Sequence, residues 1–144
     1  VGDIEPGDDP ALPELVQAID HLIVGVEMAQ RLTGYADPAE AAGALLCPGR
    51  ACATVTASER GCWYAVPGAP VRHVPKLKVA VVDTTGCGDV FHGAYAGALA
   101  KGRPLAEAVR IATVAAGLKA QQPGGREGIP DWAAVEAMLP QLAE

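Results

Sequence analysis

The sequence predicts an α/β fold in three layers, with helices on both faces of a mainly parallel sheet. Short apolar runs alternate along the chain with longer stretches whose apolar residues recur at helical spacing. One run, at residues 79–82, leads into a glycine-containing loop and then a small-residue helix, an order typical of α/β proteins. The composition agrees, because 50% of the residues are apolar and only 4% are aromatic, which indicates a core of small side chains.

The elements follow from local patterns. Asp37 and Pro38 have the order of an N-cap and a first helical residue. Gly93 and Gly97 are expected to let their helix lie close to its neighbour. The first residues resemble the end of a strand, followed by a turn-rich link at residues 6–10. We expect strands at residues 21–24, 52–56, 62–66, 71–74 and 79–82, and helices at 12–19, 27–32, 38–46, 89–99, from 104 onward, and at 131–142.

Charge and cysteine content exclude several classes of protein. The net charge of −6 argues against a nucleic-acid or anionic-membrane partner. The cysteines lack C-x-x-C spacing and are interpreted as reduced thiols rather than a disulfide frame or zinc site. No apolar run reaches about 18 residues and no signal peptide is visible. The reduced thiols lead us to expect a cytoplasmic location. The four cysteines are Cys47, Cys52, Cys62 and Cys87.

The loop after residues 79–82 predicts an anion site. Asp83 ends the expected strand, and Gly86-Cys87-Gly88 forms a tight loop in which backbone N–H groups gather around one point. Asp89 is expected to open the next helix, whose N-terminal dipole also favours an anion. A carboxylate at this point is a base placed beside an anion hole, although a plain N-cap role for Asp89 is the alternative.

The same residues carry a family resemblance. The sequence from Asp83 to Ala94, D-T-T-G-C-G-D-V-F-H-G-A, resembles the C-terminal motif D-T-x-G-A-G-D-x-F-x-G-A of the ribokinase-like (PfkB-type) carbohydrate kinases. Cys87 replaces the usual Ala, which leaves the backbone N–H unchanged. The resemblance implies a ribokinase-like α/β/α fold. Residues 1–144 would then be the C-terminal nucleotide-binding and catalytic part of that domain, with its N-terminal part missing.

This family implies ATP-dependent phosphorylation of a sugar-like hydroxymethyl group, with Mg²⁺ accompanying the nucleotide. Asp89 would be the general base. The backbone N–H groups of Gly86, Cys87, Gly88 and Asp89 would hold charge on the transferring phosphoryl group. The expected partners are a small sugar or sugar-like substrate and, in the full-length protein, a second copy forming a homodimer. The motifs do not name the sugar.

Further nucleotide contacts also rest on the resemblance. The segment from Val55 to Gly61 is similar to the family's V-T-x-G-x-x-G hairpin, with Ser58 in place of the common Gly. It makes Thr56, Ser58 and Gly61 candidates for contact with phosphate or ribose, although a hairpin alone proves nothing. Thr113 matches a position near the adenine, with core packing as the alternative. Gly124, in the late loop at 121–128, is the last nucleotide-binding candidate.

The metal sites implied by the resemblance are less complete. A potassium-like ion would lie between Asp83 and Thr85 on one side and carbonyl groups of the late loop, including Gly128, on the other; oxygen-rich loops suit such a cation. The alternative is that two turns merely cap helices. Gly25 and Met28 stand where the family often has the Asn and Glu of N-x-x-E.

Glu27 is the nearest carboxylate to those two positions, and it is either a magnesium-organising group or a solvated helix charge.

Two other readings compete with an active kinase. The first is a non-catalytic nucleotide-binding remnant or fragment of a sugar kinase, which would share every residue named above. The second is another nucleotide-binding fold. A Rossmann site is disfavoured because Gly86-x-Gly88 is followed by Gly93 rather than by a glycine at position 91. A P-loop is disfavoured because no G-K-[ST] occurs.

Overall fold

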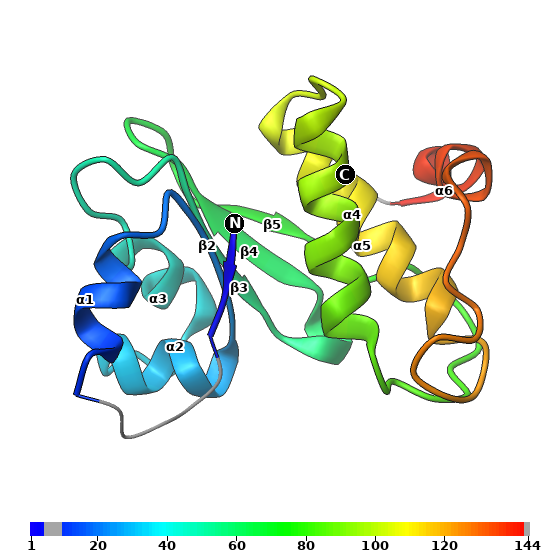
Figure 1. The fold of residues 1–144 in the computed structure, drawn as a ribbon, viewed down its shortest axis with the longest axis horizontal. Coiled ribbons are helices and arrows are strands. Elements are labelled where there is room, and N and C mark those ends of the chain that lie inside the picture. Colours follow the sequence, from blue (N-terminus) through cyan, green and yellow to red (C-terminus); the bar gives the residue numbers. More distant parts are fainter. Residues whose placement is uncertain (5–9, 143–144) are drawn as a thin grey trace. The chain divides into compact units, whose positions relative to one another are not determined.

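The computed structural model describes residues 1–4 and 10–142, and the chain divides into two compact units, Val1–His73 and Val74–Glu144 (Figure 1). Most of the turn-rich link predicted at 6–10 lies outside the described residues. Within the described part of the chain, no helix is long and apolar enough to cross a membrane.

The first unit is built on a mixed sheet in the order β1-β2-β3-β4-β5. The neighbours β1, β2 and β3 run parallel, whereas β4 is antiparallel to β3, with Thr56 opposite Cys62. The predicted strands and helices of this unit are confirmed to within a few residues. Its elements are β1 (Gly2–Asp3), α1 (Leu12–Gln17), β2 (His21–Gly25), α2 (Val26–Thr33), α3 (Pro38–Ala44), β3 (Cys52–Thr56), η1 (Ser58–Arg60), β4 (Cys62–Ala65) and β5 (Arg72–Val74).

Alternate strand residues and the three helices form the core of the first unit. Side chains alternate between the two faces of a sheet along each strand. The face buried in this core carries Leu22 and Val24 of β2 and Val55 of β3. They pack with buried residues of α1, α2 and α3, which gather beside the sheet (Figure 1). Asp37 caps α3 as predicted, since its carboxylate accepts the N–H groups of Ala39 and Glu40.

A buried arginine ties this unit together. Arg50 is 4% exposed, and its guanidinium donates to the carbonyl oxygens of Ile19, Leu45 and Val16. Val16 lies in α1, whereas Leu45 is the C-cap of α3. The last carbonyl groups of a helix lack intrahelical partners. The Arg50 guanidinium supplies hydrogen bonds to such carbonyl groups of α1 and α3 and to one in the turn before β2.

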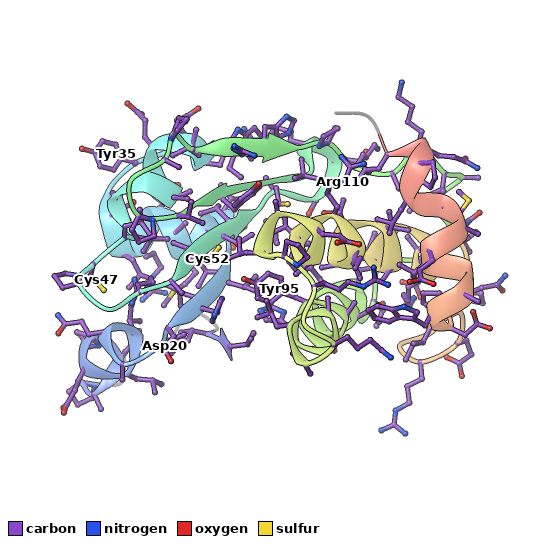
Figure 2. All side chains as sticks on the ribbon, turned by 90° about the horizontal axis from the view of Figure 1, so that it is seen from above. Asp20, Tyr35, Cys47, Cys52, Tyr95 and Arg110 are labelled. Carbon is purple, nitrogen blue, oxygen red and sulfur yellow. The ribbon has the colours of Figure 1, made fainter. Side chains whose placement is uncertain are left out.

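Helices dominate the second unit. It contains α4 (Cys87–Ala100), α5 (Leu105–Lys119), α6 (Trp132–Met138) and η2 (Leu139–Gln141). Helices α4 and α5 pack side by side, with Tyr95 of α4 fully buried (Figures 1 and 2). Arg110 of α5 donates from Nη2 to the carbonyl oxygens of Leu139 and Leu142, at 3.3 and 3.2 Å. These hydrogen bonds hold the segment after α6 against α5.

The buried strand predicted at residues 79–82 is wrong. These residues form no strand, and Val81 and Val82 are 47% and 62% exposed. Instead, the N–H groups of Val82 and Asp83 both donate to the carbonyl oxygen of Ala120, at 2.8 and 3.1 Å. The apolar pattern is that of a strand, but the partner that these backbone groups find is the end of α5 rather than another strand.

The close helix contact expected at Gly93 and Gly97 is also wrong. A Cβ atom built at either glycine meets no atom of another described segment within 4 Å. The close approach is at Gly117 of α5, where a Cβ would lie 2.8 Å from the Cβ of Leu77. Leu77 is 3% exposed, so the segment that precedes the site loop crosses α5 at this glycine.

Substitution of these glycines is therefore expected to have opposite effects on stability. Gly93→Ala should raise the free energy of unfolding by up to about 1 kcal/mol, because Ala favours a helix and finds open space. Gly117→Ala should lower it by about 1–3 kcal/mol, because the added methyl group overlaps the buried Leu77. Urea denaturation of the two variants checks this. Equal stabilisation by both would mean that Leu77 does not press on the helix at Gly117.

Candidate active site

The candidate site is built around the N-terminus of α4. The helix begins at Cys87, two residues earlier than predicted, and Gly86 is its N-cap with φ +76°. Asp89 is therefore the third helical residue and not the cap. A Cβ atom at Gly86 would lie 2.4 Å from the carbonyl oxygen of Gly125, so glycine is required here both by backbone conformation and by space.

Three backbone N–H groups in this turn remain available. The sequence led us to expect that the Cys87 N–H is free to bind an anion. Instead it donates to the Thr84 carbonyl oxygen at 3.1 Å. Among the described residues, the N–H groups of Gly86, Gly88 and Asp89 donate to no other group. Helix N-termini with open N–H groups and a favourable dipole are suited to anions. The turn thus retains three of the four predicted donors.

The Asp89 carboxylate lies in the same turn. Its side chain is exposed, and no hydrogen bond from another described residue engages it. The next residue, Val90, is 9% exposed and begins the apolar face of α4. An exposed carboxylate beside open N–H groups can accept a proton from a bound hydroxyl group while those donors hold an anion.

Asp83 fixes the loop that leads into this turn. Its Oδ1 accepts the N–H of Thr85 and its Oδ2 accepts the N–H of Gly124, both at 2.8 Å. These bonds join the turn before α4 to the late loop. They hold the pKa of Asp83 at about 2, chiefly through the backbone and hydroxyl groups of Thr85, then through Gly124, with a smaller contribution from the Lys119 ammonium. The Gly124 N–H is thereby occupied within the protein.

This low pKa predicts how stability depends on pH. The folded pKa lies below the ordinary value of 3.8, so Asp83 stabilises the fold above about pH 4. That contribution is lost as the pH falls towards about 2. Asp83→Asn should melt at a lower temperature than the unsubstituted protein at pH 6, because an amide cannot accept both N–H groups. The difference in melting temperature should shrink towards pH 2, and a constant difference would contradict the clamp.

A buried lysine that the sequence patterns did not indicate lies between these two loops. Lys119 ends α5 and has no exposed surface. Its Nζ lies 3.2 Å from the carbonyl oxygen of Gln122 and 3.4 Å from that of Asp83. The only sequence signal was a charged residue directly after the largely apolar residues 111–118 of α5. That pattern is equally typical of a solvated helix end.

The late loop also lies close to the backbone of Lys119 at Gly128. Gly128 adopts φ +77°, and a Cβ there would lie 2.5 Å from the Cβ of Gln122 and 3.3 Å from the carbonyl oxygen of Lys119. Gly128 therefore has a packing role in closing this loop against the end of α5.

The other predicted contacts lie elsewhere. Thr56, Ser58 and Gly61 belong to the first unit, where the Thr56 hydroxyl donates to the Val24 carbonyl oxygen at 3.4 Å. Ser58 adopts φ +44°, a left-handed conformation that costs energy for any residue but glycine. Thr113 is buried in α5, and its hydroxyl donates to the carbonyl oxygen of Val109 at 2.9 Å.

The carboxylate and sulfur groups do not form a metal centre. Within residues 1–4 and 10–142, no group of three His, Cys, Asp or Glu side chains is arranged to hold a metal ion. Glu27 is exposed in the first turn of α2, while Met28 is 2% exposed in the core. The four cysteines are free thiols.

The fold and the loop before α4 agree with a comparison against known protein families. The model of the pfkB family carbohydrate kinases matches residues 4–132, and the chain belongs to this family. A ribokinase of Lactococcus lactis is 39% identical over 75 residues, covering 52% of this chain and 25% of that protein. The bifunctional protein HldE of Pectobacterium carotovorum is 44% identical over 64 residues, covering 44% and 13%.

The fold of a solved relative agrees. Ribokinase of Arabidopsis thaliana, complexed with ribose and ATP, superposes with a TM-score of 0.83 at 30% identity over 95% of this chain and 46% of that one. The predicted ribokinase-like α/β fold class is confirmed. This chain spans less than half the length of each of these three relatives.

Proposed function

We propose that the natural full-length protein containing this chain transfers a phosphoryl group from ATP to a hydroxymethyl group of a small sugar or sugar-like molecule. The observation that carries this proposal is the first turn of α4, where an exposed Asp89 carboxylate stands among three unengaged N–H groups. Family membership supports it, since the matched model is that of carbohydrate kinases.

The chemistry assigns a separate task to each part of this turn. Phosphoryl transfer is catalysed mainly by positioning and by stabilising charge on the phosphoryl oxygens. The N–H groups of Gly86, Gly88 and Asp89 bind those oxygens. The Asp89 carboxylate accepts the proton of the attacking hydroxyl group and aligns its oxygen. Mg²⁺ bound with ATP would neutralise part of the charge on the phosphate oxygens.

Several further residues are proposed to contact the nucleotide. Thr56, Ser58 and Gly61 at the end of the β3–β4 hairpin supply backbone and hydroxyl groups for phosphate or ribose, and Glu27 is a candidate for orienting the hydrated Mg²⁺. Thr113 is assigned to the neighbourhood of the adenine, although its burial and its bond to Val109 equally serve the helix. Since Gly124 donates to Asp83, its contribution to the nucleotide site is to shape the loop.

The experiment is a direct assay of the natural full-length protein. Purified protein is mixed with Mg²⁺–ATP and, separately, with ribose, fructose and other small sugars, and ADP release and sugar phosphate are measured. Sugar-dependent ADP release at a rate well above the ATPase background supports the kinase. ATP binding by calorimetry without any sugar phosphate would instead support the non-catalytic remnant.

A further inference from the structure

The loops on either side of the α4 turn do not fit an added monovalent cation. The oxygen atoms that would bind it belong to the Asp83 turn and to the loop after α5. Both Asp83 carboxylate oxygens already accept backbone N–H groups, from Thr85 and Gly124. The carbonyl oxygens of Asp83 and Gln122 already face the Lys119 ammonium. An ion entering here would meet a fixed positive charge.

Lys119 is placed as a buried cation rather than as a solvated helix end. Its side chain is 0% exposed, and lysine is almost never fully buried unless it is paired. A buried ammonium is tolerated only when oxygen atoms replace its water. Here the replacement comes from two carbonyl groups on different segments, at 3.2 and 3.4 Å, with the Asp83 carboxylate contributing favourable charge.

We propose that the Lys119 ammonium is a built-in monovalent cation that positions the α4 turn, so that this protein neither binds nor needs potassium at that place. The ammonium holds the carbonyl group of Asp83 to that of Gln122. Asp83 in turn holds Thr85 and Gly124, and Gly86 lies against Gly125. The charge therefore acts on the anion-binding donors through the two loops, and Lys119 is a positioning residue without contact to the reacting atoms. The effect on rate rests on the proposed kinase function, whereas the cation binding does not.

The first test needs no substitution. The melting temperature of the natural full-length protein is measured in potassium chloride, sodium chloride and choline chloride at equal ionic strength. The proposal expects the same melting temperature in all three salts and the same kcat within about twofold. A rise in melting temperature specific to potassium would overturn it, whether or not the protein proves to be a kinase.

The second test compares two substitutions of the lysine. Lys119→Ala removes the ammonium and leaves room among the carbonyl groups, whereas Lys119→Met removes the charge and fills the space of the stem. In choline chloride both variants should melt at lower temperature, and kcat should fall by up to about 10²-fold because the turn is displaced. Potassium should raise the melting temperature and kcat of Lys119→Ala but not of Lys119→Met.

A control variant and the remaining outcomes decide whether Lys119 acts through its positive charge or only by filling space. Lys78→Ala removes an exposed lysine of the same unit and should show no potassium-specific effect. If both Lys119 variants respond alike to potassium and choline, Lys119 only fills space and the proposal fails. If Lys119→Ala folds in potassium but not in choline, the proposal holds. If the melting temperatures behave as expected but no variant or unsubstituted protein phosphorylates a sugar, the cation site stands and the kinase proposal fails.

Discussion

Asp89→Asn in the natural full-length protein is expected to lower kcat by at least about 100-fold, the lower end of the usual contribution of a general base. The amide has the shape of the carboxylate but cannot accept the proton of the sugar hydroxyl group. The backbone N–H groups that bind the phosphoryl oxygens stay in place, so the Kd for ATP should change little. Steady-state kinetics and calorimetric titration with ATP measure the two effects separately.

A matched control separates catalysis from helix stability. Glu40 is an exposed carboxylate at the third position of α3, as Asp89 is in α4. Glu40→Gln therefore removes the same favourable interaction with a helix dipole, about 0.3–1 kcal/mol, without touching the site. It should leave kcat unchanged. If Asp89→Asn keeps a near-normal kcat, or loses ATP binding and melts early, the carboxylate is not the base.

Gly86→Ala should cost both stability and activity. A left-handed conformation costs a residue with a Cβ about 1–2 kcal/mol, and the new methyl group would also meet the Gly125 carbonyl oxygen. The turn and the late loop must then separate, which moves the three open N–H groups. We expect a lower free energy of unfolding in denaturant titration and a fall in kcat of about 10²-fold.

The comparison variant is Gly88→Ala, two residues along in the same turn. Within residues 1–4 and 10–142, no atom outside this stretch of helix lies within 4 Å of a Cβ there, and its φ is not positive. The free energy of unfolding of Gly88→Ala should match or exceed that of the unsubstituted protein. Equal destabilisation by the two substitutions would show that the contact between Gly86 and the late loop does not hold the turn.

Local patterns were sufficient to predict most of the fold. Asp37 and Pro38 marked the start of α3 because a capping carboxylate and a proline act on their own neighbours. The prediction of a strand at residues 79–82 failed because their pattern specifies only an apolar extended segment. Whether such a segment becomes a strand depends on a distant partner, and here Val82 and Asp83 find Ala120. The pairing is decided by tertiary structure, which a pattern read along the chain does not contain.

The candidate site divides in the same way. Gly86 and Asp89 could be found from sequence because the strand–loop–helix motif places them in one short segment. Lys119 could not, because its two carbonyl partners differ from it by 36 and 3 positions and carry no side-chain signature. The use of the Cys87 N–H by Thr84 was hidden for the same reason, since backbone hydrogen bonds leave no mark in the residue types.

The Ala120 carbonyl group links the segment before α4 to the end of α5, so we expect the two to open together. One oxygen receives two N–H groups from the segment before α4, and it belongs to the residue that follows α5. Fraying of the last turn of α5 would release the N–H groups of Val82 and Asp83 together. The hydrogen bond that the Gly124 N–H donates to the Asp83 carboxylate would be lost with them. Amide hydrogens of these three residues should therefore exchange with solvent at similar rates, as one cooperatively opening segment. The α4 turn would then lose its support in a single event rather than bond by bond.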